Sequence, residues 1–79
     1  MSKKINIFLQ SSPLIRIRGN AGEISVPRGT RTGGLLSLLG IPPPQQPYLL
    51  VIVNRKKQSL SYKLQANDSV KLLMPIGGG

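Results

Sequence analysis

The chain lacks cysteine and histidine, and only two of its 79 residues, Glu23 and Asp68, are acidic. Without cysteine there is no disulfide framework and no thiolate metal site. Without histidine, and with so few carboxylates, the sequence offers no cluster of metal ligands. It also offers no base to activate a nucleophile for covalent catalysis. The composition therefore predicts a protein that is not an enzyme and has no metal site.

Aromatic residues and long apolar runs are also scarce. Aromatic residues make up 4% of the chain, and no apolar run reaches the length of a membrane-spanning helix. The N-terminal segment carries Lys3 and Lys4, but Asn6 and Gln10 interrupt an apolar stretch that is too short for a signal peptide. Hydrophobic residues still account for 39% of the chain, enough for one small core. We expect a soluble, cytoplasmic single domain that does not contact a membrane.

Positive charge is abundant, because eleven lysines and arginines give a net charge of +9. Such an excess indicates an acidic partner, with nucleic acid as the first candidate, or a solvated face that keeps the protein soluble. The only run of basic residues is Arg55, Lys56 and Lys57. No aromatic residues alternate with the basic ones to stack on bases. The sequence thus argues against nucleic-acid binding as the main function.

Period-two alternation of apolar residues indicates a protein rich in β-strands. Strands are predicted over residues 4–10, 14–18, 23–27, 48–54, 59–65 and 70–76, with polar turns at 55–58 and 66–69. In the last strand, alternation places Leu72 and Met74 on one side and Leu73 on the other. The residues Leu49, Val51, Leu72 and Met74 are either core or part of an exposed docking patch.

One segment has helical spacing, and it predicts a helix over residues 32–40. Thr30 or Thr32 would cap its N-terminus, Gly40 suits the position after its C-terminus, and prolines follow at once. Its packing face would consist of four leucines, Leu35, Leu36, Leu38 and Leu39. A single helix must cross one face of a mixed sheet, with the first and last strands as parallel neighbours in the middle.

The sequence ends in "LLMPIGGG", a strand-like run followed by three glycines. Glycine has no side chain to bind or react, and three in a row leave the backbone free to take many conformations. The chemically distinctive group there is the carboxylate of Gly79. This end is therefore either an unstructured remnant or the working group of the protein.

Three segments resemble the ThiS/MoaD family of ubiquitin-like sulfur carriers: "TGGLLSLLGIP", "VIVN" and "NDSVKLLMPIGGG". The segment "SSPLIRIRGNAGEISVPRG" is similar to the longer first loop of the MoaD-like subgroup, which makes 14–18 either a strand or a loop. An archaeal-type small modifier fits the same pattern. The resemblance implies an α+β, β-grasp fold with a mixed four- to five-stranded sheet and one main helix on one face. It also implies a domain over residues 1–76 and a flexible tail over residues 77–79.

The resemblance further implies a function for the tail. An adenylating enzyme of the ubiquitin-activating type would use ATP to activate the carboxylate of Gly79, which would then become a thiocarboxylate. The chain itself would bind no cofactor stably. Gly77 and Gly78 would thread into the enzyme, because residues without a Cβ fit a narrow channel. The expected docking residues are Met74, Leu72, Arg55, Lys56 and Lys57.

The destination of the sulfur stays open at this stage. The resemblance favours synthesis of a molybdopterin-type cofactor, with thiazole synthesis and tRNA thiolation as further routes through a downstream synthase. Two other functions are open: a protein modifier joined through Gly79 to lysines of target proteins, and a basic nucleic-acid-binding module. The net charge of +9 departs from the family, whose members are usually acidic or near neutral.

Overall fold

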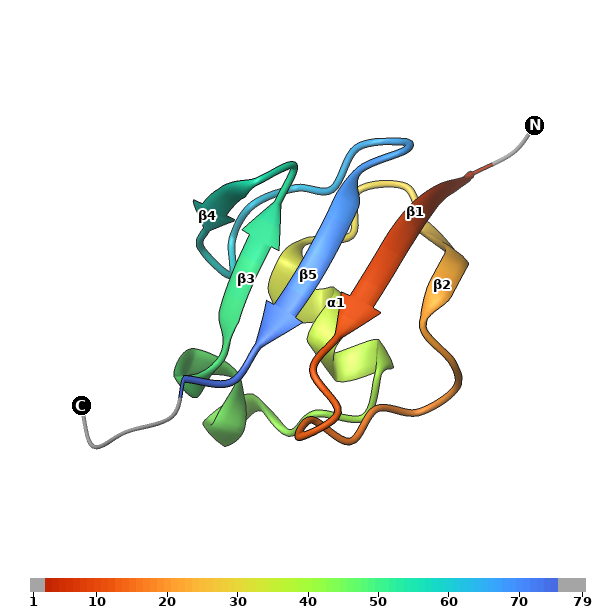
Figure 1. The fold of residues 1–79 in the computed structure, drawn as a ribbon. Helices are drawn as coiled ribbons and strands as arrows, with labels where there is room; N and C mark the ends of the chain where they lie inside the picture. The colour runs from red at the N-terminus through yellow and green to blue at the C-terminus, as the bar shows by residue number, and fades with distance from the viewer. Residues whose placement is uncertain (1–2, 76–79) are drawn as a thin grey trace.

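The structure is a computed structural model that describes residues 3–75 of the chain. It consists of a five-stranded sheet, one α-helix and one 3-10 helix (Figure 1). In chain order the elements are β1 (Lys4–Ser11), β2 (Gly22–Pro27), α1 (Thr32–Leu38), η1 (Pro43–Tyr48), β3 (Leu50–Val53), β4 (Lys56–Gln58) and β5 (Ser69–Leu73). The predictions for residues 77–79 lie outside the described residues.

The first and last strands lie side by side in the middle of the sheet, as predicted. The strand order is β2-β1-β5-β3-β4, with β1 and β5 parallel and the other neighbours antiparallel. In the parallel pair, Phe8 lies opposite Ser69 and Gln10 opposite Lys71. With one helix against a mixed sheet of this order, the protein has a ubiquitin-like β-grasp fold, which confirms the expected α+β class.

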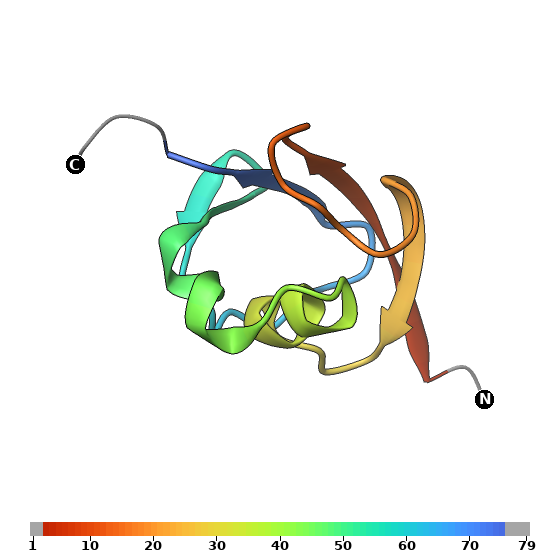
Figure 2. The ribbon, with the colours of Figure 1, turned by 90° about the horizontal axis from the view of Figure 1, so that it is seen from below.

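The helix covers one face of the sheet, and the core lies between the two (Figure 2). The alternation in β1 predicts its burial, because Ile5, Ile7 and Leu9 face the helix while the residues between them are exposed. From α1 and its C-cap, Leu35, Leu36 and Leu39 are buried as expected. The prediction for Leu38 is wrong, since this side chain is 53% exposed.

The free backbone N–H and C=O groups at the two ends of α1 form hydrogen bonds mainly with other backbone groups. At the C-terminus, Gly40 has a φ of 85°, its N–H donates to the carbonyl of Ser37, and the N–H of Ile41 donates to the carbonyl of Leu36. This is a Schellman motif, and it confirms the role predicted for Gly40. At the N-terminus the predicted threonine caps are wrong. The Thr30 hydroxyl donates to the Pro27 carbonyl, and Arg31, with no side-chain cap bond, is the N-cap residue.

The segment expected as a strand over 59–65 is a loop that closes the N-terminus of α1. The N–H groups of Thr32 and Gly33 donate to the carbonyls of Tyr62 and Leu60 at 2.9 and 2.8 Å. A Cβ on Gly33 would lie 3.2 Å from the Leu60 carbonyl oxygen, so glycine permits this close approach. The backbone of 59–65 therefore bonds to the start of the helix instead of extending the sheet.

Two further predicted segments differ from the structure. Residues 14–18 are a loop and not a strand, which agrees with the longer first loop seen in the MoaD-like pattern. Residues 55–58, predicted as a polar turn, include the short strand β4, so the turn itself is confined to Asn54 and Arg55. Within residues 3–75, no helix is both long and apolar enough to cross a bilayer.

Candidate functional site

The C-terminal end of β5 brings the chain out of the core. Leu72 is fully buried, whereas Leu73 is 37% and Met74 is 40% exposed, and Pro75 is exposed as well. Leu72 points into the core as alternation predicts, whereas Met74 comes after the last residue of the strand. The expectation that Leu72 contacts a partner is wrong, because neighbouring core side chains cover it completely.

Beside Met74 lies a largely apolar groove of about 790 Å³. Its walls come from the β1–β2 loop, the segment from Gly40 to Leu49, and the end of β5; they include Leu14, Ile15, Arg16, Ile41, Tyr48, Leu49, Met74 and Pro75. Leu14 and Tyr48 are 58% and 76% exposed, respectively, and Leu49 is half-buried. Of the four residues left open between core and docking patch, Val51 and Leu72 are core, while Met74 and Leu49 line this groove.

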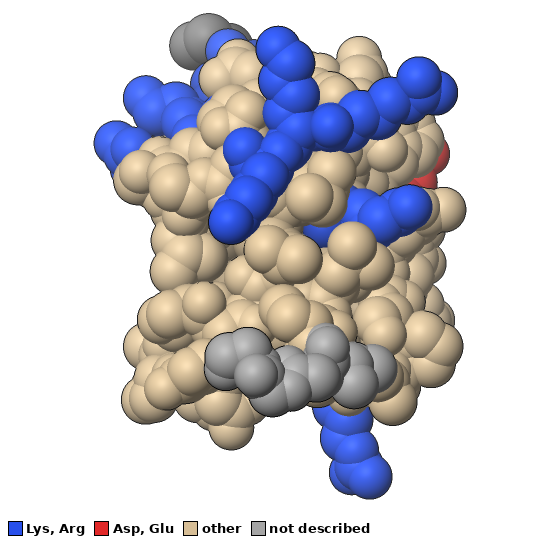
Figure 3. All heavy atoms as spheres, turned by 60° about the vertical axis from the view of Figure 1, so that its left-hand side comes forward, with Lys and Arg blue, Asp and Glu red and all other residues tan. Residues whose placement is uncertain are grey.

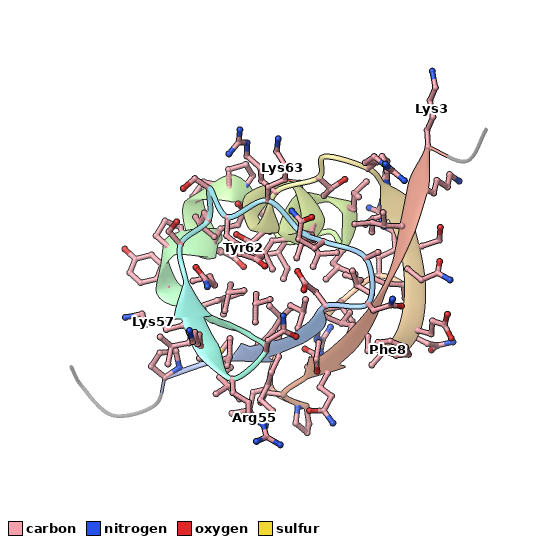
Figure 4. All side chains as sticks on the ribbon, turned by 90° about the horizontal axis from the view of Figure 1, so that it is seen from above. Lys3, Phe8, Arg55, Lys57, Tyr62 and Lys63 are labelled. Atoms are coloured by element: carbon pink, nitrogen blue, oxygen red, sulfur yellow. The ribbon has the colours of Figure 1, made fainter. Side chains whose placement is uncertain are left out.

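The basic run divides between the two faces of the sheet. A two-residue turn joins β3 to β4, with Asn54 and Arg55 at φ values of 51° and 71°. Because Lys56 pairs with buried Val53, it lies on the helix side, whereas Lys57 pairs with Ile52 on the outer face. Arg55 also projects from the outer side of the sheet, whereas Lys63 lies on the side of the helix (Figure 4).

Lys71 joins Arg55 and Lys57 on the outer face, because Ile52 of β3 lies opposite Lys57 in β4 and opposite Lys71 in β5. Arg55, Ile52 and Lys71 line one shallow depression there, together with Gln10 and Ser69. Lysine and arginine side chains gather on the side of the molecule where β4 lies, and few acidic atoms are visible there (Figure 3). Sequence reasoning did not group Lys71 with the basic run, although its place in an alternating strand was the available signal.

A buried carboxylate fixes the start of β5. Asp68 is 5% exposed and accepts hydrogen bonds from the Asn54 side-chain amide at 2.8 Å, the Tyr62 hydroxyl at 3.0 Å and the Gln65 N–H at 2.8 Å. The Asn54 side chain also accepts a bond from the N–H of Ser69 at 2.9 Å. These bonds connect the β3–β4 turn to the first residue of β5.

The same carboxylate changes the acidity of Tyr62. Burial, together with the hydrogen bond to Asp68 and its negative charge, raises the pKa of the Tyr62 hydroxyl above its usual value. The hydroxyl is thus held in its neutral, donating form. Within residues 3–75 there is no group of three or more histidine, cysteine or acidic residues that would hold a metal ion. The hydrogen bonds of Asp68 join Tyr62, Gln65 and Asn54 next to the start of β5.

Comparison with solved structures identifies the same fold in two small proteins. The crystal structure of SAMP1 from Haloferax volcanii matches with a TM-score of 0.59 and 20% identity, covering 96% of this chain and 99% of the other. The solution structure of Urm1 from Trypanosoma brucei matches with a TM-score of 0.62 and 22% identity over the full length of both chains. No protein-family model matches the sequence, and no curated protein is significantly similar to it. These likenesses establish the ubiquitin-like β-grasp fold.

Proposed function

We propose that this chain is a ubiquitin-like carrier whose working group is the carboxylate of Gly79, activated by a partner adenylating enzyme. The observation that carries the proposal is the end of β5. This central strand brings the chain to exposed Met74 and Pro75, and only four residues follow in the sequence. Fully extended, four residues span roughly 13–14 Å. That is enough to place a carboxylate in an active site while the folded part stays outside.

The chemistry follows from the weakness of a carboxylate as an electrophile. An oxygen of the Gly79 carboxylate attacks the α-phosphorus of ATP, and pyrophosphate leaves, which gives an acyl adenylate. Hydrosulfide released by a sulfur donor then attacks the carbonyl carbon of the adenylate, the bond to AMP breaks, and a thiocarboxylate is left on Gly79. The first 75 residues provide recognition and direction, and the partner enzyme provides catalysis.

The activated Gly79 carboxyl group can react with two classes of acceptor. Delivery of the sulfur to a downstream synthase would make the protein a sulfur carrier, and the MoaD-like first loop favours a molybdopterin-type cofactor over thiazole or tRNA thiolation. Attack by a lysine amine on the adenylate, directly or through an enzyme thioester, would instead make it a protein modifier. The likeness of the fold to SAMP1 and to Urm1 supports a carrier or modifier in general.

Variants of the last two residues test this proposal. Deletion of Gly79, or addition of one residue after it, displaces the carboxylate by roughly 3.3–3.6 Å. A misplacement of even 1 Å is worth about a hundredfold in rate. Gly78→Val adds a stiff β-branched side chain where the enzyme channel must be narrow. We expect each variant to lose ATP–pyrophosphate exchange with the cognate adenylating enzyme while its thermal melt is unchanged. Exchange at the wild-type rate would refute the proposal and favour the nucleic-acid-binding alternative.

The outer face of the sheet is the expected docking surface for that enzyme. Lys57→Glu and Lys71→Glu reverse charges on this face, and Lys56→Glu reverses a neighbouring charge on the helix side. Charge complementarity acts mainly on the association rate and is strongest at low salt. The outer-face variants should therefore associate more slowly than Lys56→Glu at low ionic strength. Equal rates for all three would show that this surface is only solvated.

A further inference from the structure

The outer face of the sheet, opposite α1, carries an exposed aromatic ring. Phe8 of β1 is 45% exposed, and its side chain lies on the side of the sheet away from the helix, as does that of Arg55 (Figure 4). The residues directly opposite Phe8 are Ser69 in β5 and Glu23 in β2, and neither has a large apolar side chain. A single exposed apolar residue is common on protein surfaces, so its meaning depends on its surroundings.

The strand register places basic residues beside this ring. Gln10 of β1 lies opposite Lys71 of β5. Ile52 of β3 lies opposite Lys71 on one side and Lys57 on the other, so these residues form one row across the outer face. Phe8 is the next outward residue of β1 after Gln10. Neighbouring strands are about 4.8 Å apart and two residues of a strand span about 6.6 Å, so roughly 8 Å separate the Cα atoms of Phe8 and Lys71. One ligand can therefore contact the ring and the Lys71 ammonium group at the same time.

The surface is hollowed on both sides of Lys71. Two shallow depressions, of about 240 and 370 Å³, share Gln10 and Lys71 in their linings. Arg55 and Ser69 also line the first, and Ser12 also lines the second. Neither lining includes an acidic residue. A chain-like ligand that crosses this face would thus meet polar and cationic groups on both sides of Lys71.

Acidic side chains do not neutralise this part of the face. Asp68 is 5% exposed, and its carboxylate is hydrogen-bonded inside the protein. Glu23 lies on the outer face, but on the β2 side of Phe8, where it accepts a hydrogen bond from the Asn6 side-chain amide at 2.9 Å. The chain has no other acidic side chain. A negatively charged ligand is therefore favoured on the area from Phe8 to the edge strand β4.

We propose that this area is a binding surface for single-stranded nucleic acid. One base stacks on the Phe8 ring, and the phosphates beside it contact the basic residues Arg55, Lys57 and Lys71. An aromatic ring on an open sheet, with cations next to it, binds unpaired bases together with their backbone, whatever the base. The carboxylates of an acidic protein surface could pair with the same cations, but they do not stack on a ring.

Only the strand order brings these residues together, because Phe8 is far in sequence from the basic run and from Lys71. The proposed binding needs neither Gly79 nor ATP, and it goes beyond the carrier function proposed above. It uses the same face as the expected adenylating enzyme, so the two ligands should exclude each other. Failure of either proposal leaves the other intact, because the binding assay contains no enzyme and the exchange assay contains no nucleic acid.

The test is a titration of the full-length protein with fluorescein-labelled strands of eight uridines or eight thymidines, followed by fluorescence anisotropy. Each phosphate contact on a single strand contributes about −0.7 to the slope of log K against log salt concentration, so three contacts predict a slope of about −2. An abasic strand of the same length and charge should bind roughly 5- to 100-fold more weakly, because it has no base to stack. Such binding of either strand supports the proposal, and the tighter strand identifies the preferred sugar.

Three outcomes of this titration would overturn the proposal. Equal affinity for the abasic strand would mean that charge alone binds the ligand. Equally tight binding of a peptide of eight aspartates would identify an acidic protein surface as the occupant. The absence of binding to every strand would mean that the basic residues are only solvated.

Variants of Phe8 test the stacking contact. Phe8→Leu keeps an apolar side chain but removes the ring, so it should weaken binding of the uridine strand roughly 5- to 100-fold and leave binding of the abasic strand unchanged. Phe8→Tyr keeps the ring and should bind as wild type does. Neither change should alter the salt slope. If Phe8→Leu binds the uridine strand as tightly as Phe8→Tyr, the ring is not a stacking platform.

Variants of the lysines test the phosphate contacts. Lys57→Gln and Lys71→Gln should each make the salt slope less negative by about 0.7. The matched control is Lys56→Gln, in the same strand as Lys57 but on the helix side, and it should change the slope little. Equal changes for Lys56→Gln and Lys57→Gln would refute the assigned face. Thermal melts of all variants check that the fold is intact.

Nuclear magnetic resonance of the labelled protein with the uridine strand locates the ligand directly. Amide shifts should map to β1, β5 and β4, and the ring protons of Phe8 should show contacts with base protons. Shifts confined to α1 and the groove beside Met74 would place the ligand elsewhere and contradict the proposal.

Discussion

Arg55 occupies a backbone conformation that suits glycine better than arginine. It is the second residue of the β3–β4 turn, and both turn residues have positive φ, as a type I′ hairpin requires. For a residue with a Cβ, this conformation costs about 1–2 kcal/mol. Replacing Arg55 by glycine removes that cost but adds about 0.5–1 kcal/mol of backbone entropy to be lost on folding. With both terms taken at the same end of their ranges, the net expectation for Arg55→Gly is a free energy of unfolding higher by about 0.5–1 kcal/mol.

Chemical denaturation measures this change, and a thermal melt should rise by roughly 2–8 °C for a domain of this size. The matched control is Lys56→Gly, which removes the same charge from a residue inside β4. A glycine within a strand should lower the stability by about 0.5–1 kcal/mol. Because Arg55 projects from the outer face, Arg55→Gly should also associate more slowly with the adenylating enzyme at low salt. If Arg55→Gly is no more stable than wild type, the turn stores no strain and the reasoning fails.

Three further predictions concern the core, the helix start and the buried hydroxyl. Leu39→Ala should lower the stability by about 2–5 kcal/mol because the side chain is buried, whereas Leu38→Ala should change it by less than about 0.5 kcal/mol in the same denaturation assay. Gly34→Ala should raise the stability by up to about 1 kcal/mol, since the new Cβ meets only ordinary contacts. Gly33→Ala should lower the stability, because its Cβ presses on the Leu60 carbonyl. Equal changes in stability for the two variants would contradict the packing described. The raised pKa of Tyr62 means that folding favours the neutral hydroxyl, so its contribution to stability is fully present below pH about 10 and is lost as the pH rises through the higher pKa of the folded state. Denaturation as a function of pH should therefore show the stability advantage of wild type over Tyr62→Phe shrinking above pH 10, and a constant difference would contradict the coupling.

The parts of the fold that were predictable from sequence are those in which pattern and packing coincide. Period-two alternation in β1 matches a strand covered on one face only, and the leucine spacing together with Gly40 fixes the C-terminal half of α1. The segment 59–65 shows why alternation can mislead. Leu64 is buried and Tyr62 reaches Asp68, but both do so from a loop whose backbone bonds belong to the start of the helix. In this segment the local pattern shows which side chains turn inward, but it does not show where the backbone finds its hydrogen-bond partners.

The residues that the sequence predicted for docking illustrate the same limit. The predicted turn over 55–58 is shorter than expected, so Lys56 and Lys57 lie in the strand β4. Because adjacent residues of a strand face opposite sides of the sheet, these two lysines do not form one patch. Lys71 and Lys57 lie on the same face because β3 pairs with both of their strands, and this strand order cannot be deduced from local sequence. Residue types suggested a charged surface, but the strand order decides which charges lie together.

The central claim is that the Gly79 carboxylate is the working group of the protein. The most direct measurement is the intact mass of the full chain after incubation with its adenylating enzyme, ATP and a sulfur donor. The account predicts a product in which one oxygen has been replaced by sulfur, located at Gly79 by fragmentation, formed only with ATP, and absent when one residue is added after Gly79. An unchanged mass under conditions in which the enzyme activates a known carrier would contradict the account. So would sulfur found anywhere other than the C-terminus.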